Sequence, residues 1–292
     1  MRGQSARAGV ARGAARAGVE RGAAAHAGVA RGEADIAPIG ALIGDPTRAR
    51  VLMALVDGRA LPASRLAAEA GVAPSTVSEH LARLTAAGLV TMRPAGRSKF
   101  YRLASPSVAD ALEAIARISP EQPIRSLRQG SYARALREAR TCYNHLAGRL
   151  GVGLFAGLLS RGLMAGGDGW HHPDQAVHDR LSAPGRDLSY RLTPRGEAVL
   201  GELGIDVDAV LARRPAARYC LDWSEQRHHL AGPLGTALAG RLFELGWVTR
   251  GQRRRVVRVT EAGQARLPSV LGLPAGWADP GPVTYPDGVW RA

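Results

Sequence analysis

The sequence predicts a mainly α fold with small β-hairpins, an α+β protein assembled from several modules. Three observations support this prediction. Apolar residues recur at helical spacing in several stretches after residue 45. The segment "LVTMRPAGRSKFYRLA" alternates around a turn, as the two strands of a hairpin do. A third observation is that the C-terminal half contains two copies of one sequence pattern.

Size and charge bound the possible partners of the protein. The chain has 292 residues, a formal net charge of +14 and 46% hydrophobic residues. A strongly basic chain favours a polyanion, either nucleic acid or an anionic membrane surface. The apolar run at 150–159 is about half the length of a membrane-spanning helix. The N-terminus lacks the apolar core of a secretory signal, and two cysteines are too few for a disulfide framework. We therefore expect a cytoplasmic, nucleoid-associated protein without a membrane partner.

The two ends of the chain have biased composition. Residues 1–36 repeat segments such as "ARAGVARG" and "ARAGVERG" without an apolar stripe, so we expect a disordered Arg/Gly/Ala-rich arm. This arm would either add non-specific affinity for DNA or be a dispensable leader before a later start codon. Residues 273–292 are rich in Pro and Gly and predict an extended tail.

Signals for two closely spaced helices follow the arm. Asp45 is placed as the N-cap of a helix whose first residue is Pro46, and this helix ends at Gly58. A shorter helix follows Ser64 and stops at Gly71. The next helix begins only two residues later. Helices joined by so short a turn form a helix-turn-helix.

The stretch "VAPSTVSEHLARLTAAGLV" contains the second helix of this pair. Val77, Leu81 and Leu84 share one face, which is expected to be buried. The alternating segment that follows predicts a β-hairpin with a "PAGR" tip, and 106–118 predicts another amphipathic helix. This order of elements is that of a winged helix.

The side chains left on the outer face suit DNA. A helix in the major groove needs short donors and acceptors together with a few long cations, and a basic hairpin suits the adjacent phosphates. Ala73 is a poor N-cap at the start of this helix. The predicted DNA contacts are Ser75, Thr76, Ser78, His80 and Arg83 on the helix and Arg93, Arg97 and Lys99 on the hairpin.

Three segments in this order, "DPTRARVLMAL", "LAAEAGVAPSTVSEHLARLTAAGLV" and "RPAGRSKFYRL", resemble the ArsR/SmtB-type winged-helix repressors over residues 37–119. The resemblance implies a homodimer, packed through its first and last helices, that releases its operator on meeting an inducer. A two-fold dimer predicts an inverted-repeat operator in double-stranded DNA. The alternative is a non-specific architectural DNA-binding protein. The sequence contains no phosphate-binding loop, zinc-protease motif or nucleophile elbow, so we do not expect an enzyme.

The C-terminal half contains an internal duplication. Segments 145–164 and 229–248 align without a gap and place a Leu at every fourth residue. Each copy predicts a long helix, a hairpin and a closing helix. We therefore expect two winged-helix-like modules, at 135–211 and 216–272. The basic hairpin at 251–259 is either a second wing or a solvated edge, and the first copy holds an extra loop with His171, His172 and His178.

No cofactor is predicted from these residues, and a metal ion is the alternative. Metal-sensing members of the resembled family carry a Cys pair in or near the helix before the recognition helix, where this chain has "LAAEAGV". A metal or thiol-redox sensor is one alternative, since thiolate and imidazole suit zinc. Cys142 and His145 would then lie at i and i+3 on one helix, with Cys220, His228 and His229 in the matching region. The gapless alignment pairs His145 with His229 but Cys142 with Gln226, so structural histidines and inert cysteines are the other interpretation.

Aromatic side chains on or near the duplicated helices suggest a pocket for a small-molecule inducer or, alternatively, ordinary core packing. These residues are Tyr143, Phe155, Trp223, Phe243 and Trp247.

Overall fold

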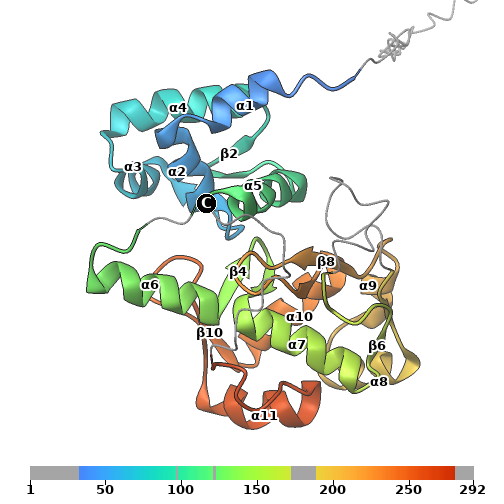
Figure 1. Cartoon of the computed structure of the whole chain (residues 1–292). Helices are drawn as coiled ribbons and strands as arrows, with labels where there is room; N and C mark the ends of the chain where they lie inside the picture. Colours follow the sequence, from blue (N-terminus) through green and yellow to red (C-terminus); the bar gives the residue numbers. More distant parts are fainter. Residues whose placement is uncertain (1–32, 97, 121–122, 172–188, 280–292) are drawn as a thin grey trace, which may run out of the picture. The chain divides into compact units, whose positions relative to one another are not determined.

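The computed structural model describes residues 33–96, 98–120, 123–171 and 189–279 (Figure 1). The arm up to residue 32, Arg97, His172, His178 and the tail from residue 280 lie outside the described residues. The described residues from Pro38 onward form one compact unit. Within the described ranges, every helix is too short or too polar to cross a membrane.

A winged helix occupies the first part of this unit. Its strands form one antiparallel sheet in the order β1-β3-β2. Its elements are α1 (Ala37–Ile43), α2 (Pro46–Leu55), β1 (Leu61–Pro62), α3 (Ala63–Ala70), α4 (Pro74–Ala86), β2 (Val90–Ala95), β3 (Ser98–Leu103) and α5 (Pro106–Ile118).

Local signals explain where these helices begin and end. The Asp45 side chain accepts a hydrogen bond from the backbone N–H of Arg48 at 2.8 Å, and Pro46 is the first residue of α2, as predicted. Gly71 ends α3 with a φ of 70°, in the left-handed region that glycine tolerates best. The turn before α4 is short, and Ala73 gives α4 no side-chain cap. The predicted helix-turn-helix is confirmed.

The C-terminal part begins with α6 (Leu127–Glu138), a helix that was not predicted from the sequence. The order hairpin, helix, strand pair, helix then occurs twice. The first copy contains β4 (Arg140–Cys142), β5 (His145–Ala147), α7 (Gly148–Ser160), β6 (Met164–Ala165), β7 (Arg191–Leu192), α8 (Pro194–Glu202) and α9 (Val207–Leu211). The second contains β8 (Arg218–Leu221), β9 (His228–Ala231), α10 (Gly232–Glu244), β10 (Val248–Arg250), β11 (Val257–Val259) and α11 (Glu261–Leu271).

The predicted long helices begin later than the repeated pattern suggested. His145 and His229 lie on strands, not at the start of helices, and the prediction was wrong there. Gly148 and Gly232, each with a φ of 73°, separate strand from helix in both copies. A backbone in the left-handed region cannot continue a right-handed helix. The pattern of a Leu at every fourth residue continues from strand to helix, because the strands before these glycines are also buried and apolar.

Two hydrophobic cores lie in the described residues. One belongs to the winged helix and runs from Val51 to Leu112, and the other runs from Ala139 to Leu273 and contains both C-terminal copies. Helices α7 and α10 lie side by side (Figure 1). Side chains from both helices line a small apolar cavity. The two copies therefore share one core.

Candidate DNA-reading face and Cys-His cluster

Helix α4 has a buried face and a polar face, as predicted. Val77, Leu81 and Leu84 have no exposed surface. Ser75 and Ser78 are exposed on the other face, together with Arg83. The Ser78 hydroxyl donates to the carbonyl of Pro74 at 2.8 Å, which leaves its oxygen able to accept from a partner. Short polar side chains of this kind let a helix approach base edges closely.

His80 lies apart from that face, because it turns toward the start of α2. Its side chain is 16% exposed, and its Nδ1 is 3.7 Å from Oδ1 of Asp45. The pKa of Asp45 lies below its ordinary value because the backbone N–H of Arg48 donates to it, and the charges of Arg48 and His80 add to this lowering. His80 thus faces the N-cap of α2, whereas Arg83 on the same helix is exposed.

The wing supplies further cations beside α4. Strand β2 begins four residues after α4 ends and pairs with β3 from Val90↔Leu103 to Ala95↔Ser98. Arg93 and Lys99 are exposed on these strands. Of the predicted DNA contacts, Arg97 lies outside the described residues. The described basic side chains of the wing are therefore available to a polyanion.

The second group of candidate residues lies on the two C-terminal hairpins. Cys142 pairs with His145 across β4 and β5, and Cys220 pairs with His229 across β8 and β9. The expected i and i+3 positions on one helix were wrong, since Cys142 and His145 are cross-strand neighbours. Cross-strand partners have side chains on the same face of a hairpin.

The strand pairing in the two hairpins also shows that the gapless alignment of the two copies was wrong before the histidine. Two residues separate Cys142 from His145, whereas eight separate Cys220 from His229. The longer loop of the second hairpin shifts the register before the histidine. Cys220 is therefore the structural equivalent of Cys142, and Gln226 is not. Both the cysteine and the histidine are duplicated.

The two pairs face one another across a buried junction. The sulfur atoms and the nearest ring nitrogens of Cys142, His145, Cys220 and His229 all lie within 4.8 Å of one another. Nε2 of His145 is 3.2 Å from Nε2 of His229. Both histidines and Cys142 are less than 5% exposed, and Cys220 is partly buried. All four residues were candidates from the sequence, but their proximity depends on the fold.

Burial and neighbouring groups act differently on the two histidines. Burial places the pKa of His229 well below its ordinary value, which favours the neutral imidazole. Burial also disfavours the charged form of His145, but its neighbour Cys142 and the carboxyl groups of Asp110 and Glu113 raise its pKa above the ordinary value. A hydrogen bond with Cys220, together with burial, raises the pKa of Cys142 well above that of a free thiol. Neutral imidazole is the form that binds a metal, and a thiol must lose its proton to do so.

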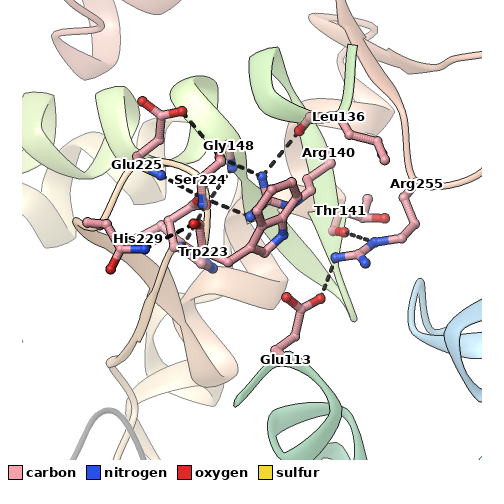
Figure 2. Close-up of polar contacts among 12 residues, drawn as sticks. Glu113, Leu136, Arg140, Thr141, Gly148, Trp223, Ser224, Glu225, His229 and Arg255 are labelled. Carbon is pink, nitrogen blue, oxygen red and sulfur yellow. Dashed lines mark hydrogen bonds and ion pairs between the residues drawn. The ribbon is translucent and has the colours of Figure 1, made fainter. Parts of the chain in front are cut away.

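A buried ion pair joins the hairpins beside the cluster (Figure 2). Arg140, only 1% exposed, donates through Nη2 to Oδ1 of Asp222 at 2.9 Å. Asp222 also accepts from the backbone N–H of Gly148, the first residue of α7, at 2.7 Å. Burial disfavours the carboxylate, but the Arg140 charge and these contacts hold the pKa of Asp222 far below its ordinary value. Its Oδ2 lies 3.4 Å from Nδ1 of His229.

Sequence reasoning missed Asp222 and Arg140. Asp222 lies in the longer loop, two residues after Cys220, in "CLDW". An alignment of the copies with a gap between cysteine and histidine would have isolated this loop as the feature present in one copy alone. Arg140 carried no signal, because nothing in its neighbours distinguishes a buried arginine from the many exposed ones.

The aromatic candidates occupy different environments. Phe155 lines the cavity between α7 and α10, and its ring meets Tyr190 edge-on with centroids 4.8 Å apart. The guanidinium group of Arg140 lies over the ring of Trp223, with its Cζ 4.5 Å from the ring centre. The remaining three do not line this cavity: Tyr143 packs on the winged-helix core, and Phe243 and Trp247 pack on the C-terminal core.

The basic hairpin at 251–259 contacts protein. Arg254 pairs with Glu69 of α3 at 2.9 Å and donates to the carbonyl of Met53. Arg255 is buried and pairs with Glu113 of α5 (Figure 2). These contacts join the second copy to the winged helix. They use cations that a second wing would need for DNA.

Comparisons with known proteins agree with this architecture. A family described as a helix-turn-helix domain matches residues 43–93. The "uncharacterized HTH-type transcriptional regulator YdfF" of Bacillus subtilis is 36% identical over 240 residues, which cover 82% of this chain and 98% of that protein. The chain belongs to the ArsR-type family of winged-helix transcriptional regulators. It is a DNA-binding regulator of transcription and not an enzyme.

Other members match a shorter part of the chain. The HTH-type transcriptional regulator CmtR of Mycobacterium tuberculosis is 39% identical over 95 residues, covering 31% of this chain and 80% of CmtR. The solved structure of CmtR, described as a cadmium metal-sensor, is 38% identical and covers 32% of this chain and 99% of that one, with a TM-score of 0.25. The similarity of this ArsR-type chain to YdfF covers almost the whole length of YdfF and therefore extends into the C-terminal copies.

Proposed function

We propose that this ArsR-type regulator is a homodimeric, ligand-responsive repressor that reads an inverted-repeat operator with α4 and the β2–β3 wing. The observation that carries the proposal is the exposed face of α4, where hydroxyl side chains lie beside Arg83 and next to a basic wing. In this proposal the hydroxyl groups contact base edges in the major groove, and Arg83 and the wing contact phosphates. The proposed contacts are Ser75, Thr76, Ser78, Arg83, Arg93, Arg97 and Lys99, with His80 as a support for the helix.

Exposed apolar side chains on the last helix of the winged helix, and just before its first helix, support self-association. Ile118 is 85% exposed and Ile115 is 39% exposed on α5, and Ile36 beside α1 is 78% exposed. Helix α1 has no buried residue. In the proposed dimer a second copy covers these side chains and removes their apolar surface from water.

The remaining parts of the proposal concern sensing and location. The two C-terminal copies carry the inducer-responsive part, and the protein acts in the cytoplasm at the nucleoid. An inducer moves the equilibrium only if it binds the operator-competent and operator-free states with different affinity.

The test is binding to the DNA upstream of the protein's own gene, measured by fluorescence anisotropy across a salt series, with a scrambled duplex as the control. About eight phosphate contacts in a dimer predict a log–log salt slope near −7. A dimer predicts protected half-sites about 34 Å apart. Equal, weak affinity for both duplexes would instead indicate the architectural DNA-binding protein.

A further inference from the structure

The Cys-His cluster consists of donors that one class of ion prefers. Two sulfur and two imidazole donors, contributed equally by the two hairpins, suit a thiophilic divalent ion such as Zn²⁺. A disulfide would use the two sulfur atoms alone and would leave the facing histidines without a role. The donor set therefore favours a metal ion over a thiol switch.

The distances match tetrahedral coordination. Zn–N bonds of about 2.0–2.1 Å and Zn–S bonds of about 2.3 Å place the ligand atoms of a tetrahedral site about 3.3–3.8 Å apart. The two Nε2 atoms are 3.2 Å apart, and the full set lies within 4.8 Å. An adjustment of about 1 Å in the positions of the donor atoms is enough to close the site around an ion of this size.

The opposite ring nitrogens orient both histidines. Nδ1 of His229 faces Oδ2 of Asp222 at 3.4 Å, a distance without full hydrogen-bond geometry. Nδ1 of His145 lies 3.4 Å from Oδ1 of Asn144. An oxygen near Nδ1 favours a proton there and leaves Nε2 as the metal donor, which is the usual outer arrangement of metal-bound histidine.

Close packing against α7 and α10 fixes the strands that carry the histidines. A Cβ at Gly235 would lie 2.6 Å from the carbonyl oxygen of Leu230 and 3.3 Å from Cβ of His145. Gly151 approaches Leu146 in the same way, and its added Cβ would lie 3.6 Å from Cβ of His229. Each helix thus packs on its own hairpin and on the histidine of the other copy. Such packing holds the donors in place before an ion binds.

We propose that Cys142, His145, Cys220 and His229 form a tetrahedral site for a thiophilic divalent metal ion of the Zn²⁺ class, and that its occupation changes the affinity of the regulator for DNA. Residues 37–119 contain no cysteine, so this site is separate from the winged helix. The regulatory part of the inference rests on the proposed function, whereas metal binding does not.

A short connection leads from the site to α5. The backbone N–H of Thr141, next to Cys142, donates to the carbonyl of Arg255 at 2.8 Å, and Nε of Arg255 donates to the carbonyl of Thr141 at 3.0 Å. The same guanidinium group pairs with Glu113 on α5 (Figure 2). An ion that draws Cys142 toward the other donors therefore acts on a strand that is tied to α5, the helix of the proposed dimer contact.

Metal binding is tested first, on the full reduced chain without DNA. Titration with Zn²⁺ against a chromophoric chelator is expected to give one ion per protomer. Co²⁺ is expected to give the visible absorption of a tetrahedral ion and a thiolate charge-transfer band. No stoichiometric Zn²⁺ binding, or a Co²⁺ spectrum without a thiolate band, would overturn the proposal.

Variants assign the donors. Cys220→Ser is expected to reduce Zn²⁺ affinity by more than the 10- to 100-fold typical of an outer hydrogen-bond partner, and to halve the thiolate band. His171→Ala removes a partly buried histidine outside the cluster and is expected to leave Zn²⁺ affinity unchanged. Equal affinity losses in both variants would overturn the assignment. If a variant fails to fold, the Co²⁺ spectrum of the wild-type chain still tests the metal site.

The regulatory part is tested by anisotropy with operator DNA, with and without stoichiometric Zn²⁺. We expect a change in DNA affinity of about 5- to 150-fold, the usual size of an allosteric coupling. Glu113→Gln is expected to retain Zn²⁺ binding and to reduce this change. Zn²⁺ binding with unaltered DNA affinity would overturn the regulatory part alone. Absence of operator binding in both states would instead overturn the proposed function and leave the metal site standing.

Discussion

Arginine has opposite environments in two regions of this regulator. On α4 and the β2–β3 wing, Arg83 and Arg93 are exposed. On the C-terminal hairpins, Arg140 is 1% exposed beside Asp222, and Arg255 is 8% exposed beside Glu113. The net charge of +14 includes all of them equally. What a polyanion meets therefore depends on where each cation lies and on which carboxylate already neutralises it.

Desolvation explains why the two environments have different consequences. A buried charge that loses its partner remains in a medium that cannot solvate it, whereas an exposed charge is stabilised by water and screened by salt. Changes at the buried pairs should therefore act on folding, and changes at the exposed cations should act on DNA affinity. Substitutions in each region test this expected difference between buried and exposed charges.

The largest expected effect is on stability, from Asp222→Ala. This substitution leaves Arg140 buried without its carboxylate and removes the acceptor at the start of α7. We expect a loss of about 3–5 kcal/mol in the free energy of unfolding, measured by urea denaturation. A double variant, Arg140→Met with Asp222→Leu, should recover part of the loss, because no unpaired charge remains. A double variant as unstable as the single one would contradict this explanation.

The same carboxylate predicts a pH dependence. Arg140 holds the folded-state pKa of Asp222 below the ordinary value of 3.8, so its contribution to stability is present above that value. The contribution decreases as the pH falls toward the folded-state pKa. The difference in unfolding free energy between wild type and Asp222→Ala should therefore narrow below about pH 4. A difference that stays constant down to pH 2 would indicate that the carboxylate charge is not the cause.

A smaller effect, confined to DNA binding, is expected from Lys99→Ala on the wing. Each lost phosphate contact lowers the magnitude of the log–log salt slope by about 0.9, so a dimer loses about 2. The matched control is Arg258→Ala, which removes an exposed cation from β11 of the second copy. Its salt slope should equal that of the wild type. Equal changes in both variants would show that net charge, rather than the wing, determines affinity.

The winged helix could be predicted in detail because its signals are local. An N-cap aspartate, a first-turn proline, the glycine after α3 and one alternating segment each act over a few residues, and the structure has them where the sequence placed them. The predicted end of the first helix at Gly58 was wrong, since α2 ends at Leu55 and a turn precedes the glycine. The missed helix α6 is polar, with no buried residue. It has no apolar stripe by which a sequence pattern could be recognised.

The Cys-His cluster shows what could not be predicted. The chemistry of its four residues was evident, but their proximity depends on two hairpins that lie about 80 residues apart in the chain. The gapless alignment hid the equivalence of Cys142 and Cys220, since the longer loop interrupts it. The Arg140–Asp222 pair was equally inaccessible, because burial of a charged residue is decided by tertiary contacts and leaves no local pattern.

The smallest expected effect concerns the start of α4, in the exposed region. Ala73 has an extended backbone and no side chain that can accept a hydrogen bond from the first turn. Ala73→Ser is expected to cap Thr76 N–H and to raise the free energy of unfolding by about 0.5–1 kcal/mol in urea denaturation. Ala87→Ser, at the other end of the helix, is the control and should change it by less than about 0.5 kcal/mol. A gain only at residue 73 would show that the stability of α4 is limited by one missing hydrogen-bond acceptor at its start. Equal changes at both ends would contradict a missing cap and would mean that water already satisfies the backbone N–H groups of the first turn.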